Sequence, residues 1–450
     1  MKPDYSQISK IENPEIIFLN HASFIIKMND IKIIIDPYLY GSAFNNGWNL
    51  LKEIDHTNEI KDITHIFYTH EHPDHFSIPF LKKIEPDIRK NITILYQETY
   101  DKRVKIFCES MGFKFKEIKD GVEQKIDNQL NVLIGKVPFF DSWINFKINE
   151  FNILNVNDCV LENPKLVFDI KKKLNRKIDV LFTQFSYANF IETGNQKNVA
   201  LQQLENIKQQ DKILCPSYLI PFASFIYFSH KENKFMNKNI NSIREAYDFI
   251  KINCKAKPVI LKPNECWNFK EKQNEVSLQF WDNLYKNIEN FNYHSVIKKF
   301  DINEIIKESK EYVKRIKKKN NRFLIYLLHY LNFFPSITIY VSDIDKYLEF
   351  NILKGLKIFS NKIISKKFIS LSSESLIFVL KYEFGLDTLL VNARLKCDEN
   401  YLKTVTKCLF IASLNNTGRY IGFTHFSRYL NVNFLYRGLE KLYLKKNLML

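Results

Sequence analysis

The chain contains few glycines and prolines, 11 and 13 in 450 residues, which argues against long flexible linkers. It also lacks a glycine-rich loop of the Walker or dinucleotide-binding type, so neither kind of phosphate site is expected. The seven cysteines are dispersed and include no Cys-x-x-Cys or Cys-x-His pair, which excludes a zinc ribbon and a Rieske iron–sulfur site. An odd, scattered set of cysteines is typical of a reducing compartment, and we expect a cytoplasmic protein.

Long apolar runs are missing as well. The longest, residues 323–334, includes His329 and Asn332 and is about twelve residues long, whereas a membrane-spanning helix needs roughly twenty apolar residues. We expect a buried or interfacial helix there, which leaves peripheral membrane contact open. Residues 1–6 contain no apolar stretch, so no signal peptide is expected.

The charge of the chain is strongly positive and unevenly distributed. The formal net charge is +16, and residues 301–450 hold 25 Lys and Arg against 13 Asp and Glu. One interpretation is a surface for an anionic partner such as a nucleotide-sugar, a phospholipid or a polynucleotide. The other is that the lysines solvate ordinary helices, and we favour it because charge alone reports solubility and association. Nucleic-acid binding is therefore not expected.

The pattern along the chain predicts an α+β protein. Runs rich in β-branched and aromatic residues predict strands at 15–19, 23–26, 31–35, 64–68, 92–96, 130–134, 151–156, 180–183 and 212–214, with helices at 78–84 and 199–210. Strands interleaved with helices favour two sheets covered by helices. A charged helical stretch at 278–319 predicts a linker to a second, basic α+β unit at 320–450. There we expect strands at 337–341 and 388–391 and a helix at 373–382.

Three of the ten histidines lie within six residues, directly after the apolar run 64–68. His70 and His72 alternate and can hold one metal ion, whereas Asp74 and His75 turn away and can hold a second. Neutral imidazoles and carboxylates are ligands for zinc, iron and manganese. Two such ions would share a hydroxide that is nucleophilic near neutral pH. A polar loop that is histidine-rich by accident is the disfavoured alternative.

His-x-His-x-Asp-His after an apolar strand resembles the motif of the metallo-β-lactamase superfamily. The segments at 20–24 and 35–39 look like the opening hairpin of the branch that contains ascorbate-lactonases and N-acylphosphatidylethanolamine phospholipase D. The segments at 36–39, 43–44, 47–48, 155–159 and 220–223 look most like the metallo-β-lactamase part of CMP-N-acetylneuraminate hydroxylase. The resemblance covers roughly residues 12–270. It implies a four-layer αββα sandwich, and we expect a catalytic domain of this kind over 1–277.

The family pattern implies a ligand set. His70 and His72 would bind the first metal, and Asp74 and His75 the second. Asp158 matches the bridging aspartate, and His230 matches the final histidine, with Asp74 and His230 also expected to act in catalysis. No histidine lies between 75 and 230, so the usual third histidine of the first metal is absent. Asp141 is the candidate in its place, a solvated turn being the alternative, and a carboxylate there favours iron or manganese over zinc.

Other residues carry weaker signals. Asp36 follows a strand and could orient a ligand histidine, or be a plain turn residue before proline. His21 could line the pocket or hydrogen-bond within the core. Ser186 and Tyr187 are more simply read as loop residues than as substrate contacts, and His65 as a core histidine.

Two reactions and one binding role follow from these residues. The favoured reaction is metal-dependent hydrolysis of an ester, amide, lactone or phosphodiester in a small, anionic substrate. The alternative is a di-iron oxygenase that hydroxylates a sugar or nucleotide-sugar. Since the Cys-x-His pairs are missing, its electrons would come from a separate protein. The basic unit at 320–450 could bind a lipid or a partner that brings the catalytic domain to its substrate.

Overall fold

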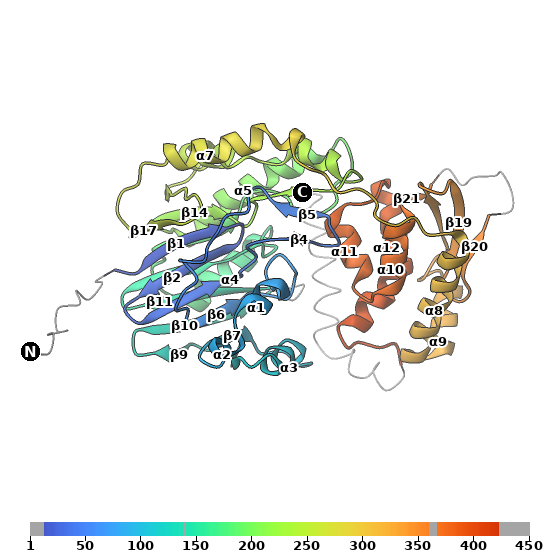
Figure 1. Ribbon diagram of the computed structural model, residues 1–450, viewed down its shortest axis with the longest axis horizontal. Coiled ribbons are helices and arrows are strands. Elements are labelled where there is room, and N and C mark those ends of the chain that lie inside the picture. Colours follow the sequence, from blue (N-terminus) through green and yellow to red (C-terminus); the bar gives the residue numbers. More distant parts are fainter. Residues whose placement is uncertain (1–12, 138–140, 360–366, 423–450) are drawn as a thin grey trace, which may run out of the picture.

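The computed structural model describes residues 13–137, 141–359 and 367–422 (Figure 1). The first of two large sheets has the order β17-β1-β2-β3-β6-β7-β8. Its strands are β17 (Glu265–Trp267), β1 (Glu15–Asn20), β2 (Ser23–Met28), β3 (Ile31–Ile35), β6 (His65–Tyr68), β7 (Thr93–Gln97) and β8 (Lys114–Ile118). Strands β3, β6, β7 and β8 are parallel, and β1 to β3 form an antiparallel meander.

The second large sheet has the order β16-β14-β13-β12-β11-β10-β9. It consists of β16 (Lys257–Pro258), β14 (Tyr218–Phe222), β13 (Val180–Gln184), β12 (Phe151–Asn155), β11 (Ser142–Ile148), β10 (Leu130–Lys136) and β9 (Gln124–Asp127). Strands β12, β13, β14 and β16 are parallel, whereas β9 to β12 are antiparallel. A small sheet of β15 (Ile226–Phe228), β5 (Trp48–Leu50) and β4 (Ser42–Ala43) lies beside them.

Successive residues of the first sheet enter two different cores, because side chains alternate across a strand. Ile35, Phe67 and Leu95 join the core that lies between the two large sheets. Their neighbours Ile34 and Ile66 join a second core under the helices of the outer face. The strands are therefore buried on both faces, which explains their nearly continuous apolar sequences.

Helices cover the outer face of each large sheet (Figure 1). On the first sheet these are α1 (Ile78–Lys83), α2 (Pro86–Arg89) and α3 (Arg103–Ser110). On the second they are α4 (Pro164–Leu174), α5 (Gln196–Leu214), α6 (Ile243–Asn253) and α7 (Glu275–Lys286), with short 3-10 turns at Lys234–Asn239 and Ile288–Asn290. The predicted four-layer αββα sandwich is confirmed.

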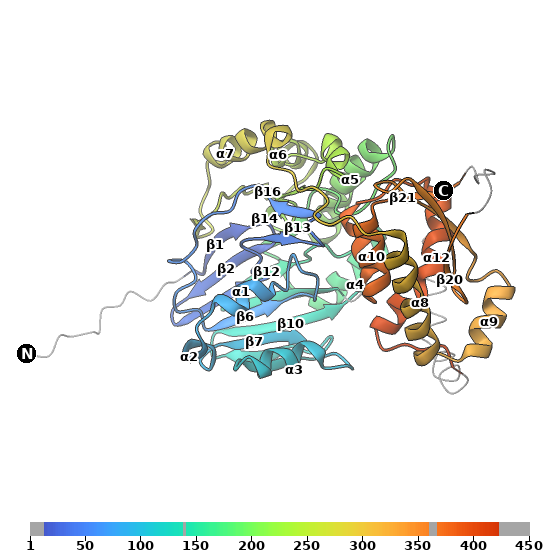
Figure 2. The same ribbon diagram turned by 45° about the vertical axis from the view of Figure 1, so that its right-hand side comes forward.

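The C-terminal part has its own core and its own sheet (Figure 2). The sheet order is β20-β19-β18-β21, formed by β20 (Gly355–Ile358), β19 (Lys346–Asn351), β18 (Ile337–Val341) and β21 (Ile369–Leu371). The helices are α8 (Ile302–Lys319), α9 (Arg322–Tyr330), α10 (Ser373–Lys381), α11 (Gly385–Asn392) and α12 (Glu399–Asn416). This is the α+β unit that the sequence predicts.

Two predicted strands are wrong. Residues 212–214 are the last turn of α5, whose buried face includes Leu204 and Ile207 and whose helix ends at the left-handed Cys215. Residues 388–391 lie within α11, where Leu386 and Leu389 are buried one helical turn apart. Both segments are short apolar runs, and such runs occur equally in strands and in the buried turns of helices.

The segment predicted as a linker, 278–319, contributes to both cores. Leu278 and Trp281 of α7 belong to the core between the large sheets, whereas Ile305 and Tyr312 of α8 belong to the C-terminal core. The domain limits at 277 and 319 stay a prediction, and residues 1–12 and 423–450 of the predicted domains lie outside the described residues. Among those described, no helix is long and apolar enough to cross a membrane.

Candidate metal centre

The candidate ligands gather at one edge of the sandwich, because the strands that carry them end or begin there. In the first sheet, the β1–β2 turn carries His21, β3 ends before Asp36, and β6 ends before His70. The start of β2 lies beside the end of β3, and β3 is parallel to β6, so these three positions share an edge. In the second sheet, Asp141 precedes β11 and Asp158 follows the adjacent end of β12 by the same logic.

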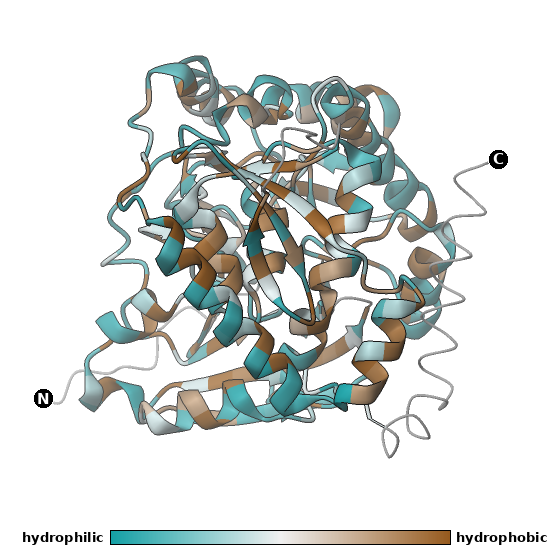
Figure 3. Cartoon of the chain, turned by 90° about the vertical axis from the view of Figure 1, so that its right-hand side faces the viewer, coloured by the Kyte–Doolittle hydropathy of each residue, from teal (hydrophilic) through white to brown (hydrophobic). Residues whose placement is uncertain are grey.

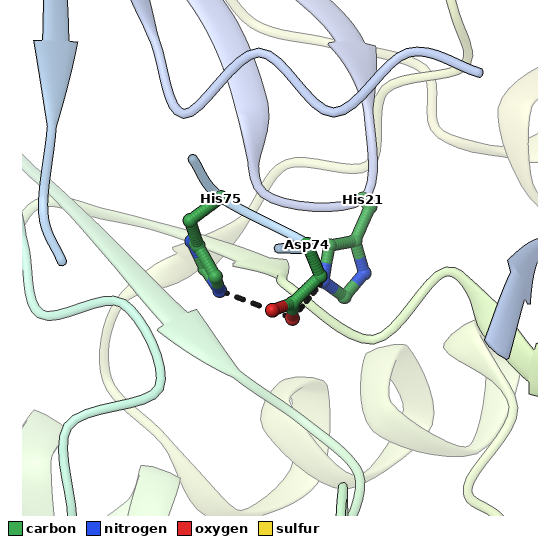
Figure 4. Close-up of side chains that lie close together, drawn as sticks. All are labelled: His21, Asp74 and His75. Carbon is green, nitrogen blue, oxygen red and sulfur yellow. Dashed lines mark hydrogen bonds and ion pairs between the residues drawn. The ribbon is translucent and has the colours of Figure 1, made fainter. Parts of the chain in front are cut away.

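Three sets of side chains within this edge have the arrangement of metal ligands. They are His70, His72 and Asp141; His70, His75 and Asp158; and His21, Asp74 and His75, with the ligand atoms of each set within 4.8 Å of one another. In the first set, Nε2 of His70 lies 2.8 Å from Nδ1 of His72. The last set is drawn in Figure 4, where one carboxylate oxygen of Asp74 lies 3.3 Å from Nε2 of both histidines.

Asp158 lies between the two outer ligand sets, which are His70, His72 and Asp141 on one side and His21, Asp74 and His75 on the other. Its Oδ2 lies 3.9 Å from Nε2 of His70 and 3.7 Å from Nε2 of His75. Its side chain keeps 20% of its exposure, whereas the side chains of His70 and His75 are almost completely buried. A carboxylate in this position can bridge two ions, and the centre opens toward solvent on the side of Asp158.

The buried ligand atoms fit metal ions because most of them have no other partner. Nε2 of His75, Oδ1 of Asp74, Oδ1 of Asp141 and Oδ1 of Asp158 are buried and accept or donate no hydrogen bond. Native proteins rarely leave such atoms unpaired unless an ion or water completes them. Burial, followed by the charge of Asp158, raises the pKa of Asp141 well above its ordinary value, and burial also raises the pKa of Asp158. A bound cation would relieve this repulsion.

The surroundings shift the pKa values of His70 and His75 in opposite directions. Burial, together with His75 and His72, holds the pKa of His70 well below 6.5, so its imidazole is neutral and able to bind a metal. Burial also acts to lower the pKa of His75, but the carboxylates of Asp74, Asp158 and Asp36 outweigh it and raise that pKa. These carboxylates favour a protonated His75 in the absence of a metal, and a metal ion at Nε2 would compete with that proton.

Asp36 and Thr69 orient His70 and His75 through the Nδ1 atoms, on the side of each ring away from the centre. Oδ1 of Asp36 accepts a 2.8 Å hydrogen bond from the Thr69 amide, and Oδ2 accepts from the Thr69 hydroxyl at 2.7 Å and from Nδ1 of His75 at 3.0 Å. Nδ1 of His70 lies 3.0 Å from the Thr69 hydroxyl. Both histidines therefore direct Nε2 toward the centre. The orienting role predicted for Asp36 agrees with these contacts.

Replacing Asp36 by asparagine should weaken metal binding about 10- to 100-fold, the usual cost of losing a partner that orients a metal ligand. An amide has only one acceptor oxygen, so it cannot accept from the Thr69 amide and from His75 together, and its NH2 group must face one of these two donors. The measurement is a competition titration of the purified protein with a chelator of known affinity. Unchanged affinity, with an intact fold, would contradict an orienting role.

The structure separates one predicted ligand from the others. Nδ1 of His230 lies 3.3 Å from Glu232, in a group with Arg394, and His230 belongs to none of the three ligand sets. Its assignment as a ligand and catalytic residue stays a prediction that these contacts do not support. His21 takes part instead, and sequence reasoning left its role open. The feature that could have identified His21 as a candidate ligand is its place in a tight turn at the same sheet edge as the histidine motif.

Of the weaker candidates, two are held by structural contacts. The hydroxyl of Tyr187 donates to the carbonyl of Met236, and the Ser186 hydroxyl accepts from the Asn241 amide at 3.0 Å. Both side chains are buried, as a structural role requires. His65 is half-buried and contacts the Thr64 hydroxyl at 2.9 Å.

The C-terminal unit reaches the surroundings of the centre through the loop 44–47. Three consecutive residues of this loop, Phe44 to Asn46, adopt left-handed conformations, and the Phe44 ring packs edge-on at 5.8 Å from the His72 ring. The side chain of Asn392, at the end of α11, donates to the Phe44 carbonyl at 3.1 Å. The C-terminal unit therefore holds the loop that contacts a candidate metal ligand.

Comparison with known proteins agrees with this geometry. Residues 15–168 match the beta-lactamase superfamily domain. The chain is 28% identical over 273 residues to cytidine monophosphate-N-acetylneuraminic acid hydroxylase of Pongo pygmaeus, a match that covers 53% of this chain and 43% of that protein. The hydroxylase of Cricetulus griseus is 29% identical over 257 residues, with 53% and 45% covered. The match thus spans less than half the length of these relatives.

Among solved structures, the diiron β-hydroxylase CmlA from Streptomyces venezuelae aligns with a TM-score of 0.42 and 13% identity. That alignment covers 57% of this chain and 54% of CmlA. The family match, together with the sheet order, assigns the N-terminal part to the metallo-β-lactamase fold and confirms the resemblance predicted from the histidine motif.

Proposed function

We propose that the protein is a dinuclear iron oxygenase that hydroxylates a small anionic molecule of the sugar or nucleotide-sugar class. The observation that carries the proposal is Asp141, which completes the set with His70 and His72 where the superfamily pattern has a third histidine. The relatives named above are hydroxylases of a nucleotide-sugar, and they support the substrate class.

The donor set supports iron. Asp74, Asp141 and Asp158 place three carboxylates around four histidines, and carboxylate oxygens are harder donors than imidazole nitrogens. A mixed set of histidines and carboxylates favours iron or manganese, whereas a histidine-rich set suits zinc. Two iron ions held here would supply the redox chemistry that activates dioxygen.

The residues of the chain then have separate tasks. His70, His72 and Asp141 would hold one ion, His21, Asp74 and His75 the other, and Asp158 both. Asp36 keeps the proton of His75 on Nδ1, so that Nε2 remains free for the metal. Overall, one oxygen atom of O2 enters a C–H bond and the other leaves as water, which consumes two electrons and two protons. The electrons would come from a separate reductase protein, since the chain has no Rieske cysteine–histidine pairs.

Metal-dependent hydrolysis is the second candidate, and the sequence alone ranks it first. Asp158, which lies between the two outer ligand sets and keeps 20% of its side-chain exposure, favours it, because a site that solvent can reach there can hold a bridging hydroxide. Its substrate would be an ester, amide, lactone or phosphodiester. Zinc would serve this reaction as well as iron.

Metal analysis of protein purified without oxygen separates the two reactions. The oxygenase requires about two irons per chain and uptake of one O2 per two irons when the dithionite-reduced protein meets oxygen. Iron removal by a chelator should abolish that uptake, and Fe²⁺ but not Zn²⁺ should restore it. Two zinc ions together with oxygen-independent cleavage of a p-nitrophenyl ester or bis(p-nitrophenyl) phosphate would contradict the oxygenase and support hydrolysis.

A further inference from the structure

The segment 312–342 combines basic charge with exposed apolar side chains. It contains no Asp or Glu, and its six basic residues are Lys314, Arg315, Lys317, Lys318, Lys319 and Arg322. They lie at the end of α8 and the beginning of α9. An excess of one charge on a short segment attracts surfaces of the opposite charge.

Helix α9 presents an apolar stripe outward. Its large exposed residues and their exposed fractions are Phe323 at 64%, Tyr326 at 57%, Leu327 at 38% and Tyr330 at 79%, followed by Leu331 at 58% and Phe333 at 65%. Positions 323, 326, 327, 330 and 331 follow the spacing of one helix face. The residue opposite, Ile325, is completely buried in the C-terminal core. The helix thus has two apolar faces, and the part of the chain that the structure describes covers only one.

The exposed face is built into the fold. The Asn321 side chain caps the helix by accepting from the Leu324 amide at 3.1 Å. Nδ1 of His329 donates to the Phe334 carbonyl at 2.5 Å, and Asn351 donates to Nε2 of His329 at 2.9 Å. The helix is therefore fixed to the β19 side of its domain while its stripe faces solvent. Figure 2 shows α9 at the end of the C-terminal unit that is farthest from the sandwich.

Basic side chains beside the stripe remain available to a partner. Lys317 donates to the Leu353 carbonyl and Lys319 pairs with Glu383. Lys318 and Arg322 are exposed. Residues 312–342 contain no Asp or Glu that could neutralise them. Figure 3 views the molecule from this side, where brown apolar segments alternate with teal ones on the C-terminal helices.

We propose that this face of α9, with the basic end of α8, binds the surface of an anionic lipid bilayer. Phe and Tyr side chains suit the boundary between lipid headgroups and acyl chains, where their rings are apolar and the Tyr hydroxyl stays hydrated. Lysine and arginine beside them add electrostatic attraction to anionic lipid. A stripe of this kind lies in the plane of the interface and does not span the bilayer. The proposal is independent of the reaction at the metal centre.

The test is sedimentation of the full-length protein with vesicles of phosphatidylcholine, with or without 30% phosphatidylserine (roughly the anionic regime in which basic residues act). We expect binding to the anionic vesicles that falls as salt screens the charges. Lys318→Glu with Arg322→Glu should reduce the partition coefficient at least about 25-fold, since each basic residue contributes about fivefold. Phe323→Ser with Tyr330→Ser should reduce it about tenfold or more by removing inserted apolar area.

Matched control variants change the same chemistry elsewhere. Lys90→Glu with Lys177→Glu reverses two charges on the sandwich, where these side chains are 69% and 73% exposed. Tyr100→Ser with Ile252→Ser removes apolar residues that are 98% and 80% exposed. Both controls should bind vesicles as the natural chain does, and metal content should be equal in all variants.

Three outcomes would overturn the proposal. The first is no binding to anionic vesicles at low salt, and the second is equal binding by the α9 variants and their controls. The third is a concentration-dependent dimer that the Phe323→Ser and Tyr330→Ser changes abolish while vesicle binding persists, which would assign the stripe to a second copy of the chain.

Discussion

Replacing Asp158 by alanine should lower the metal content from two ions to about one per chain. It should also reduce activity by more than about 100-fold, the upper end of the loss caused by residues that only orient a ligand. Among the described residues, Asp158 is the one carboxylate that lies within 4 Å of histidines from both outer ligand sets. Without it, neither group of histidines would have the carboxylate that we expect the two ions to share. Metal content by mass spectrometry and oxygen uptake by the reduced protein are the measurements.

The fold should survive this change. In the metal-free protein the Asp158 charge raises the pKa of Asp141, so its removal relieves repulsion among buried carboxylates. Urea denaturation of the metal-free variant should therefore give a free energy of unfolding equal to or above that of the natural chain. Asp87→Ala, at a side chain that is 99% exposed on α2, is the control and should alter neither property. Two metals in the Asp158 variant would refute a bridging position.

Replacing Arg394 by alanine should destabilise the protein by about 3–5 kcal/mol, the usual cost of removing one partner from a buried ion pair. The Arg394 side chain has no exposure, and its guanidinium donates to Glu232 at 2.7 Å, to Glu374 at 2.6 Å and to the Asn45 carbonyl at 2.9 Å. Without it, two carboxylates that are each about four-fifths buried face one another uncompensated. Urea denaturation followed by circular dichroism is the measurement.

A triple variant distinguishes charge from packing. Arg394→Met with Glu232→Gln and Glu374→Gln removes all three charges and keeps similar volumes, and such replacements are often neutral. We expect the triple variant to recover most of the stability that Arg394→Ala loses. If it were as unstable as the single variant, the ion pairs would not be the cause.

Much of the sandwich could be predicted because its strands are buried on both faces. Ile33, Ile34 and Ile35 form an uninterrupted run of β-branched apolar residues, which suits a strand covered on both faces. The histidine motif was equally informative, because its residues follow β6 directly and share one turn. The fold and four of the candidate ligands, His70, His72, Asp74 and His75, are therefore local features of the sequence.

The remaining site depends on contacts between residues far apart in the chain. His21 meets Asp74 across 53 positions because β1, β3 and β6 end, and β2 begins, at one edge, and that strand order is not written in any single segment. His230 follows an apolar strand as a ligand would, yet a partner from the C-terminal unit, Arg394, organises its neighbour Glu232. The errors at 212–214 and 388–391 have a local origin, since segments of three or four largely apolar residues are too short to reveal their period.

The contact of the C-terminal unit with the loop 44–47 affects whether the two parts of the chain can be separated. Ala393 completes a buried cluster with Phe44 and Trp48 of the sandwich, and Gly47 lies so close to Asn392 that a Cβ there would come within 2.3 Å of the Asn392 Cβ. The two halves have therefore been fitted to each other at a residue where only hydrogen is small enough. A sandwich expressed alone would present this apolar cluster to water, so we expect the part with the candidate metal centre to depend on the part whose described residues supply no candidate ligand.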